Sequence, residues 1–114
     1  MVNVNRGELV LVDLNPVVGT EQSGIRPAVI VQVNKANKTS PHTIIVPLTS
    51  KIRNVILPSH VFLASGTCGL AQDSVALCEQ IRVVDKQRVI KIMGSLPYEK
   101  INEINKALST ILAI

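Results

Sequence analysis

Short runs of Val, Ile and Leu, separated by Gly, Pro, Asn and Ser, dominate most of this chain. Such runs are typical of β-strands, because β-branched residues suit a pleated surface and the intervening residues suit turns. The pattern predicts strands at residues 8–14, 27–33, 43–48, 60–64, 74–81 and 88–94. The segments between them are too short for the helical crossovers that parallel strands need. We therefore expect a strongly bent antiparallel sheet or a small barrel.

The end of the chain follows a different period. After Pro97 the apolar residues recur at spacings of three and four, at Ile101, Ile104, Leu108, Ile111 and Leu112. This spacing predicts an amphipathic helix, with Pro97 at its first position. Because its end is so apolar, we expect it to pack against the sheet or against a second copy of the chain. The expected fold class is mainly β with one C-terminal helix.

The connections between the predicted strands carry more polar chemistry than the strands. Residues 34–41 and 49–59 are expected to be loops, and residues 84–88 one helical or 3₁₀ turn. The connection at 15–26 places Glu21, Gln22 and Arg26 close together between glycines and a proline. A connection of this length inside a small domain is usually functional.

Composition narrows the class of protein. A chain of 114 residues that is 46% hydrophobic and 18% charged predicts one folded domain over 1–114. The N-terminus has no signal-peptide pattern, and no run approaches the ~18 apolar residues that a membrane helix needs, so we expect a cytoplasmic protein. Cys68 and Cys78 are expected to be reduced thiols, with Cys78 in the core.

The net charge of +4 favours a polyanionic partner, although one Phe, one Tyr and no Trp leave little scope for stacking on bases. No metal site is expected, since His42 and His60 are isolated and the aspartates are scattered. No nucleotide-binding motif is present, so no cofactor is expected. The two histidines could form an acid–base pair, but each stands at a strand entrance and is expected to be structural.

One pair of residues stands out when the strands are paired. If 27–33 and 43–48 run antiparallel, Arg26 lies beside Thr49. A guanidinium and a hydroxyl together can donate several hydrogen bonds to a phosphate that gains charge during transesterification. The alternative is that Arg26 pairs with Glu21 at the surface and Thr49 is a turn residue.

Several segments, in order along nearly the whole chain, resemble the MazF (PemK-like) toxins of toxin–antitoxin pairs. They are "RGELVLVDLNPVVGTEQSGIRPAVIVQ" (6–32), "VPLTS" (46–50), "LPSHV" (57–61), "GL" (69–70), "DSVALCEQIRVVDKQR" (73–88) and "GSLPYEKINEINKAL" (94–108). The resemblance implies an SH3-like small barrel with a C-terminal helix, forming a homodimer. It also implies a metal-independent endoribonuclease that cuts single-stranded RNA at a short sequence and is silenced by a MazE-like antitoxin.

The resemblance places the family's catalytic arginine on Arg26 and its catalytic threonine on Thr49. Arg26 is too basic to accept a proton, so we expect it to stabilise the transition state; it is also a candidate proton donor. Thr49 would donate a neutral hydrogen bond to a phosphate oxygen. Some members carry a catalytic arginine and aspartate where this chain has Leu77 and Glu79, so the general base stays open between Glu21 and Glu79.

Polar side chains near these motifs are candidates for contacts with RNA. They are Gln22, Ser50, Lys51, Arg53, Gln80 and Arg82. The expected products are a 2′,3′-cyclic phosphate and a 5′-hydroxyl. Two alternatives remain at this point: a barrel of the same fold that binds RNA or protein without cutting, and a related toxin that acts on gyrase.

Overall fold

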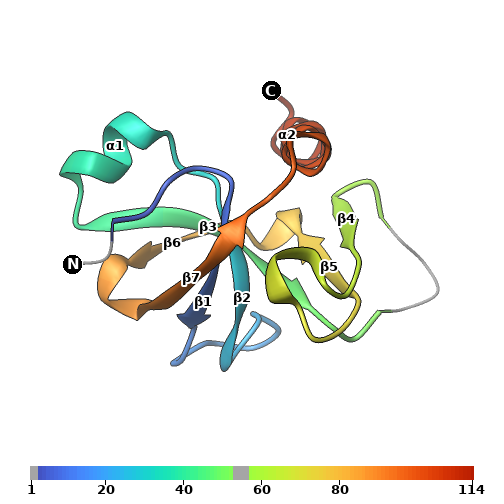
Figure 1. Cartoon of the computed structure of the whole chain (residues 1–114), viewed down its shortest axis with the longest axis horizontal. Coiled ribbons are helices and arrows are strands. Elements are labelled where there is room, and N and C mark those ends of the chain that lie inside the picture. Colours follow the sequence, from blue (N-terminus) through green and yellow to red (C-terminus); the bar gives the residue numbers. More distant parts are fainter. Residues whose placement is uncertain (1–2, 53–56) are drawn as a thin grey trace.

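The structure, a computed structural model, describes residues 3–52 and 57–114. A bent seven-stranded sheet carries the long helix α2 near one end (Figure 1). In chain order the elements, with η for a 3₁₀ turn, are β1 (Glu8–Asp13), β2 (Ile25–Ile30), α1 (Asn34–Thr39), β3 (His42–Thr49), β4 (His60–Leu63), η1 (Thr67–Gly69), β5 (Ser74–Leu77), η2 (Cys78–Gln80), β6 (Arg82–Asp85), η3 (Lys86–Arg88), β7 (Val89–Ser95) and α2 (Tyr98–Leu112).

The strands pair antiparallel throughout the described residues, as the sequence predicts. Their order is β4-β5-β3-β2-β1-β7, and β6 pairs with β3 beside this path. The path does not return on itself between β4 and β7. The SH3-like arrangement is therefore a strongly bent sheet, rather than a barrel whose ladder closes.

Strand β3 joins the two halves of the sheet, because one of its edges pairs with two successive strands. Its first half pairs with β6 and its last two residues pair with β5. The strand predicted at 74–81 therefore ends at Leu77, and the chain passes through η2 before it resumes as β6. No Gly or Pro marks this break, and the polar residues Glu79 and Gln80 also fit the exposed face of a strand, so the sequence did not indicate it. The predicted turn at 84–88 is present as η3.

A short helix, α1, replaces the loop predicted at 34–41. It is held by the buried side chain of Asn37, whose Nδ2 donates to the carbonyl of Gln32 at 2.9 Å. The Oδ1 of Asn37 accepts a hydrogen bond from the hydroxyl of Thr43 at 2.8 Å. Because polar contacts and not an apolar face hold this helix, hydrophobic spacing gave no sign of it.

The core is divided between the two faces of the sheet. On β1, Leu9 packs on the face covered by α2, while its neighbour Val10 packs on the opposite face. The same alternation appears in β2, where Val29 and Ala28 belong to different clusters. Successive strand residues point to opposite faces, so burial of both faces explains why these strands read as unbroken apolar runs.

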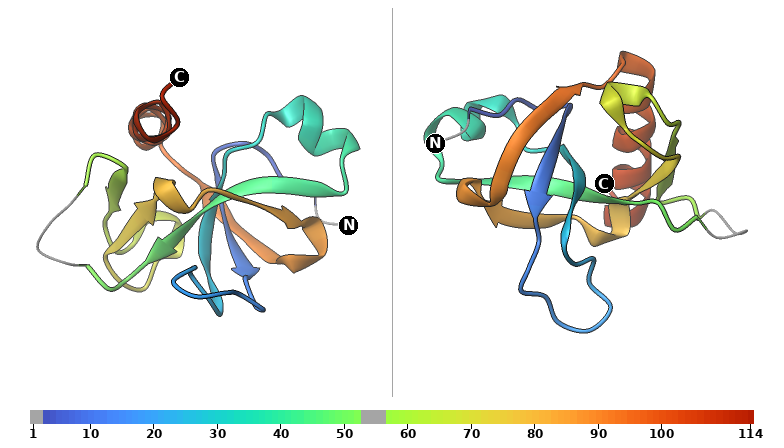
Figure 2. Two further views of the ribbon diagram at one scale, coloured as in Figure 1. Left: turned by 180° about the vertical axis from the view of Figure 1, so that it is seen from behind. Right: turned by 60° about the horizontal axis from the view of Figure 1, so that its bottom comes forward.

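Helix α2 covers one cluster by contacting β4 and η2 (Figure 2). Its buried residues are Ile104, Ala107 and Leu108. Pro97 occupies the N-cap position, so the helix begins at Tyr98, one residue later than predicted. The last predicted apolar positions do not pack within the single chain, since Ile111 is 45% and Leu112 46% exposed.

Both cysteines are free thiols, and Cys78 is buried as predicted. Burial, together with the negative charge of Glu79, raises the pKa of Cys78 to about 12. The described part of the chain contains no helix that is long and apolar enough to cross a membrane.

Candidate active site

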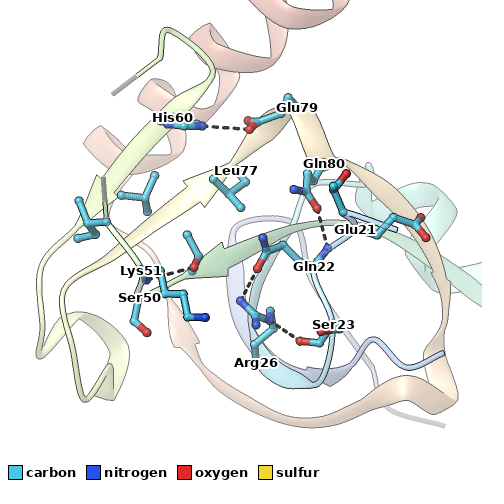
Figure 3. A pocket seen from close by; sticks show the side chains of 14 residues that line it. Glu21, Gln22, Ser23, Arg26, Ser50, Lys51, His60, Leu77, Glu79 and Gln80 are labelled. Carbon is cyan, nitrogen blue, oxygen red and sulfur yellow. Dashed lines mark hydrogen bonds and ion pairs between the residues drawn. The ribbon is translucent and has the colours of Figure 1, made fainter. Parts of the chain in front are cut away.

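An open groove of about 530 Å³ lies between the β1–β2 connection, the end of β3 and the η2 turn (Figure 3). All four predicted catalytic residues line it. So do the predicted RNA contacts apart from Arg82, which lies in an adjoining hollow, and Arg53, which lies outside the described residues. The lining residues are Thr20, Glu21, Gln22, Ser23, Arg26, Thr49, Ser50, Lys51, Ile52, His60, Val75, Leu77, Glu79 and Gln80.

The pairing of β2 with β3 brings Arg26 and Thr49 together. Ala28 pairs with Pro47, and the same register continued by two residues sets Arg26 opposite Thr49. Both side chains line the groove, and both also line a second hollow that extends toward residues 70–74. The juxtaposition expected from the strand pattern is therefore present.

The Arg26 guanidinium is held by three acceptors on the protein. Its Nε donates to the carbonyl of Ser23 at 2.8 Å, and its Nη1 donates to the carbonyl of Leu48 at 3.0 Å and to Oε1 of Gln22 at 2.5 Å. Within the described residues Nη2 has no protein partner, and no ion pair joins Arg26 to Glu21. The guanidinium is thus oriented by neutral groups that leave its charge uncompensated.

The Thr49 hydroxyl shapes the turn that follows β3. Its Oγ1 accepts a hydrogen bond from the backbone N–H of Lys51 at 3.2 Å. Since a hydroxyl can donate one hydrogen bond while it accepts another, Thr49 can still donate to a ligand. Ser50 and Lys51 are exposed beside it.

The β1–β2 connection brings Glu21 and Gln22 to the groove. The Oε1 of Glu21 accepts a hydrogen bond from the N–H of Val18 at 2.6 Å, which closes a turn inside the connection. The N–H of Gln22 donates to Oε1 of Gln80 at 2.8 Å. This bond joins the connection to η2 across the groove (Figure 3).

At the far side of the groove, Glu79 forms a pair with His60. The ring Nε2 of His60 lies 3.0 Å from Oε2 of Glu79, and the hydroxyl of Ser59 donates to Oε1 at 3.0 Å. The N–H of Leu57 donates to Nδ1 of His60 at 3.3 Å, which leaves Nε2 to face Glu79. His60, which was expected to be only structural, therefore lines the groove. The sequence feature that could have drawn attention to it is the "LPSHV" segment, which is part of the family resemblance.

Competing effects set the pKa of Glu79. Burial alone would raise it, but hydrogen bonds from His60, from the backbone N–H of Glu79 and from Ser59, with the charge of His60, lower the pKa below its usual value. Glu79 is therefore ionised at neutral pH. Its negative charge lies across the groove from Arg26 and Lys51 (Figure 3).

Arg82 follows η2 and lines the adjoining hollow with Thr20, Gln22 and Gln80. Its Nη1 is buried and has no hydrogen-bond partner in the described part of the chain. This hollow shares residues 20–22 and 79–80 with the main groove, so the two form one continuous surface.

The described residues contain no group of three or more His, Cys, Asp or Glu side chains placed to hold a metal ion. The site instead combines one uncompensated guanidinium, hydroxyls, two carboxylates and an imidazole. Such a set can bind a phosphate and move protons without a metal.

Residues 5–112 match the family model of the PemK-like, MazF-like toxins of type II toxin–antitoxin systems. The endoribonuclease EndoA of Bacillus subtilis is 40% identical over 111 residues, which cover 97% of this chain and 96% of that protein. The endoribonuclease MazF of Staphylococcus saprophyticus is also 40% identical, over 97% of this chain and 92% of its own. This chain belongs to the PemK-like, MazF-like toxin family.

Solved structures share the fold. MazF from Deinococcus radiodurans superposes with a TM-score of 0.84 at 25% identity, over the full length of both chains. A mycobacterial endoribonuclease bound to its cognate antitoxin superposes with a TM-score of 0.80 at 23% identity, over 97% of this chain and 96% of that one. The bent sheet with its C-terminal helix is therefore the fold of these toxins.

Proposed function

We propose that this chain is a metal-independent endoribonuclease that cuts single-stranded RNA at a short sequence. The 2′-hydroxyl attacks the adjacent phosphorus, which leaves a 2′,3′-cyclic phosphate and a 5′-hydroxyl. The observation that carries the proposal is the placement of Arg26 beside Thr49 in a groove that also holds two carboxylates. The two relatives named as endoribonucleases support internal cleavage of RNA.

Arg26 stabilises the charge that grows on the phosphate in the transition state. Three acceptors already orient its Nε and Nη1, so the N–H groups of Nη2 are left for a phosphate oxygen. Donors that are fixed in advance stabilise a developing charge without reorganising during the reaction. Thr49 adds a neutral hydrogen bond, and Arg26 is also the candidate donor to the departing 5′-oxygen.

Two carboxylates are candidates for the base that takes the proton from the 2′-hydroxyl. Glu21 is exposed and has one oxygen committed to the loop, while Glu79 has both oxygens hydrogen-bonded to Ser59 and His60. The lowered pKa of Glu79 keeps it ionised but makes it a weaker base. Glu21 is therefore the better candidate, and Glu79 with His60 fits the binding of a base or sugar.

The surface on either side of Arg26 offers a path for the RNA backbone. The main groove continues on one side toward residues 70–74 and on the other toward Arg82. Gln22, Ser50, Lys51, Gln80 and Arg82, together with Arg53, are the proposed RNA contacts. Cationic side chains along such a path would make binding depend on salt.

The family and its solved complexes suggest how the activity is controlled. Because solved relatives include a toxin bound to its cognate antitoxin, we propose a MazE-like antitoxin for this chain as well. We also propose that the chain acts as one domain over 1–114, in the cytoplasm and as a homodimer. The exposed apolar end of α2, with Ile111 and Leu112, suits burial in such an assembly.

The test is to incubate the purified chain with a long single-stranded RNA in excess EDTA and to map the cut sites and their end groups. Arg26→Ala is measured beside it, with Lys91→Ala as a control that removes an exposed positive charge on β7. We expect cuts at one recurring short sequence with 5′-hydroxyl ends, absent in Arg26→Ala and present in Lys91→Ala.

Loss of cutting in EDTA that returns with a divalent metal would contradict the metal-independent reaction. A folded preparation that cuts no RNA of varied sequence would contradict the nuclease itself. Growth arrest with intact mRNA but damaged DNA would instead favour the gyrase-directed alternative.

A further inference from the structure

The β1–β2 connection lies on the groove but has little buried surface of its own. Among its residues, 18–21 and Ser23 are exposed, and Val17 is the half-buried residue that packs against the core. Gly19 in its middle and Gly24 at its end adopt positive φ angles of 62° and 79°. Figure 2 shows this connection, in blue, extending beyond the ends of β1 and β2. A segment of this kind opens easily unless side chains anchor it.

Most hydrogen bonds of the connection are internal or go to its flanking strands. The N–H of Leu14 donates to Gly24 at 3.0 Å, and the N–H of Val18 donates to Glu21 at 2.6 Å. The bond from the N–H of Gln22 to Oε1 of Gln80 is different, because it ties residues 16–23 to a distant part of the chain. The start of the connection is also tied to η3, because Nη1 of Arg88 donates to the carbonyl of Asn15. Within the described residues the bond to Gln80 is the long-range hydrogen bond of residues 16–23.

The residue anchored in this way is also the one that orients Arg26. The side chain of Gln22 accepts from Nη1 of Arg26 at 2.5 Å, and the next residue, Ser23, accepts from its Nε at 2.8 Å. Two of the three acceptors of Arg26 therefore belong to the connection, and the third, Leu48, belongs to β3. If the connection moves, the direction of the guanidinium moves with it.

We propose that Gln80 is a positioning residue that sets the orientation of Arg26 through Gln22. The hydrogen-bond chain Gln80–Gln22–Arg26 holds the connection and fixes Nε and Nη1 of Arg26, which leaves Nη2 without a partner among the described residues. This inference rests on the proposed nuclease function for its effect on catalysis, whereas the hydrogen-bond chain itself does not depend on the reaction. A small displacement of an oriented catalytic group is enough to slow a reaction severely.

The side-chain amide of Gln80 also has an Nε2 group, which suggests a competing explanation for this residue. Oε1 of Gln80 is occupied by Gln22, while its Nε2 has no partner within the described residues and points into the groove (Figure 3). If Gln80 served only to read a base through Nε2, its loss would alter which sequences are cut. If it positions Arg26, its loss lowers the rate at every site and leaves the choice of site unchanged.

The experiment compares three variants with the unchanged chain. Gln80→Leu removes the acceptor at similar size, Gln80→Glu keeps an acceptor oxygen, and Gln87→Leu makes the same change at an exposed position on η3. Hydrogen exchange of the Gln22 backbone N–H is followed by NMR, and single-turnover cleavage of a long RNA is followed with its cut sites. The exchange measurement requires no nuclease activity.

In Gln80→Leu we expect the Gln22 N–H to exchange about 10-fold faster or more, because its acceptor is gone. Cleavage should slow by about 10-fold at all sites, with the same cut sequence. Gln80→Glu should restore protection of the Gln22 N–H, and Gln87→Leu should match the unchanged chain. The double variant Gln22→Ala/Gln80→Leu should cleave no more slowly than the slower single variant, since both act through one chain of bonds.

Unchanged exchange at Gln22 in Gln80→Leu would overturn the proposal, and so would a changed cut sequence at an unchanged rate. If the unchanged chain cuts no RNA, the proposed function fails by itself, and the exchange of the Gln22 N–H still decides whether Gln80 holds the connection.

Discussion

The two sides of the groove are held in place by different kinds of hydrogen bond. On one side, Arg26 and Thr49 stand on neighbouring strands, and the β2–β3 ladder sets which residue faces which. On the other side, Glu79 and Gln80 stand on a 3₁₀ turn and are oriented by side-chain bonds to His60 and Gln22. The relative position of Arg26 and Thr49 therefore depends on many backbone hydrogen bonds at once. The orientation of Glu79 and Gln80 depends on a few individual side chains.

This difference implies that the two sides respond differently to substitution. Removing one side chain does not disturb a backbone ladder, so a change at Arg26 or Thr49 should affect chemistry more than structure. A change at Glu79 or Gln80 should also alter how the groove is shaped. Substitutions at Leu108, Arg26, Thr49 and Glu79 test that distinction.

Leu108→Asp should unfold the protein, because it disturbs both sides at once. Leu108 is 8% exposed on the face of α2 that covers η2 and β4. An unpaired carboxylate there costs several kcal/mol, on the order of 5, which is comparable to the whole stability of a small domain. Circular dichroism and thermal melting will measure it, with Asn102→Asp, at an exposed position on the same helix, as the control. Equal melting temperatures for both variants would contradict the assigned helix face.

Arg26→Lys should lose about 10²–10³-fold in cleavage rate while the melting temperature stays near that of the unchanged chain. Lysine keeps the positive charge but has no planar fork, so it cannot bind the carbonyls of Ser23 and Leu48 while it presents further N–H groups. Single-turnover kinetics with RNA will measure the loss. A rate within about threefold of the unchanged chain would mean that charge alone suffices.

Thr49→Ala should lower the cleavage rate by about 10-fold and weaken RNA binding much less, since one neutral hydrogen bond is lost. Thr49→Ser keeps the hydroxyl and is the matched control. Affinity is measured with an RNA whose 2′-hydroxyls are replaced by hydrogen, so that it cannot be cut. An equal loss of rate and affinity would assign Thr49 to substrate positioning rather than to the transition state.

Glu79→Gln should have the smallest effect, a pH-dependent loss of about 2–4 °C in melting temperature. The pKa of Glu79 is lowered in the folded state, so its ionised form stabilises the protein above the unfolded pKa of about 4.3. This contribution disappears as the pH falls through the lower folded-state pKa. Melting curves of both proteins from pH 7 to pH 3 should therefore converge at the acid end. A gap that widens below pH 4 would give the opposite sign.

Much of the fold could be predicted because it follows from local pattern. Apolar runs and turn residues located the strands, and three- and four-residue spacing located α2. The places where the prediction was wrong are those held by polar side chains. Asn37 holds α1 through buried hydrogen bonds, and in the η2 turn Glu79 and Gln80 bond to His60 and Gln22 although no Gly or Pro marks the turn.

The candidate site divides in the same way. Arg26 and Thr49 could be placed together because antiparallel pairing of two adjacent strands leaves few registers. His60 could not be assigned to the groove from its strand-entrance position alone, since the contact that brings it there is with Glu79, far along the chain. A long-range side-chain contact leaves no periodic mark in a sequence.

The sequence alone was enough to predict most of the strand and helix pattern, the pairing that sets Arg26 opposite Thr49, and the family resemblance. The folded structure was needed to show that Gln80 holds Gln22, that His60 pairs with Glu79, and that Gln22, Ser23 and Leu48 orient the guanidinium of Arg26. Periodicity and strand pairing are local or nearly local properties of the backbone. The direction of a polar side chain instead depends on which distant group supplies its partner, and that is known only once the chain has folded.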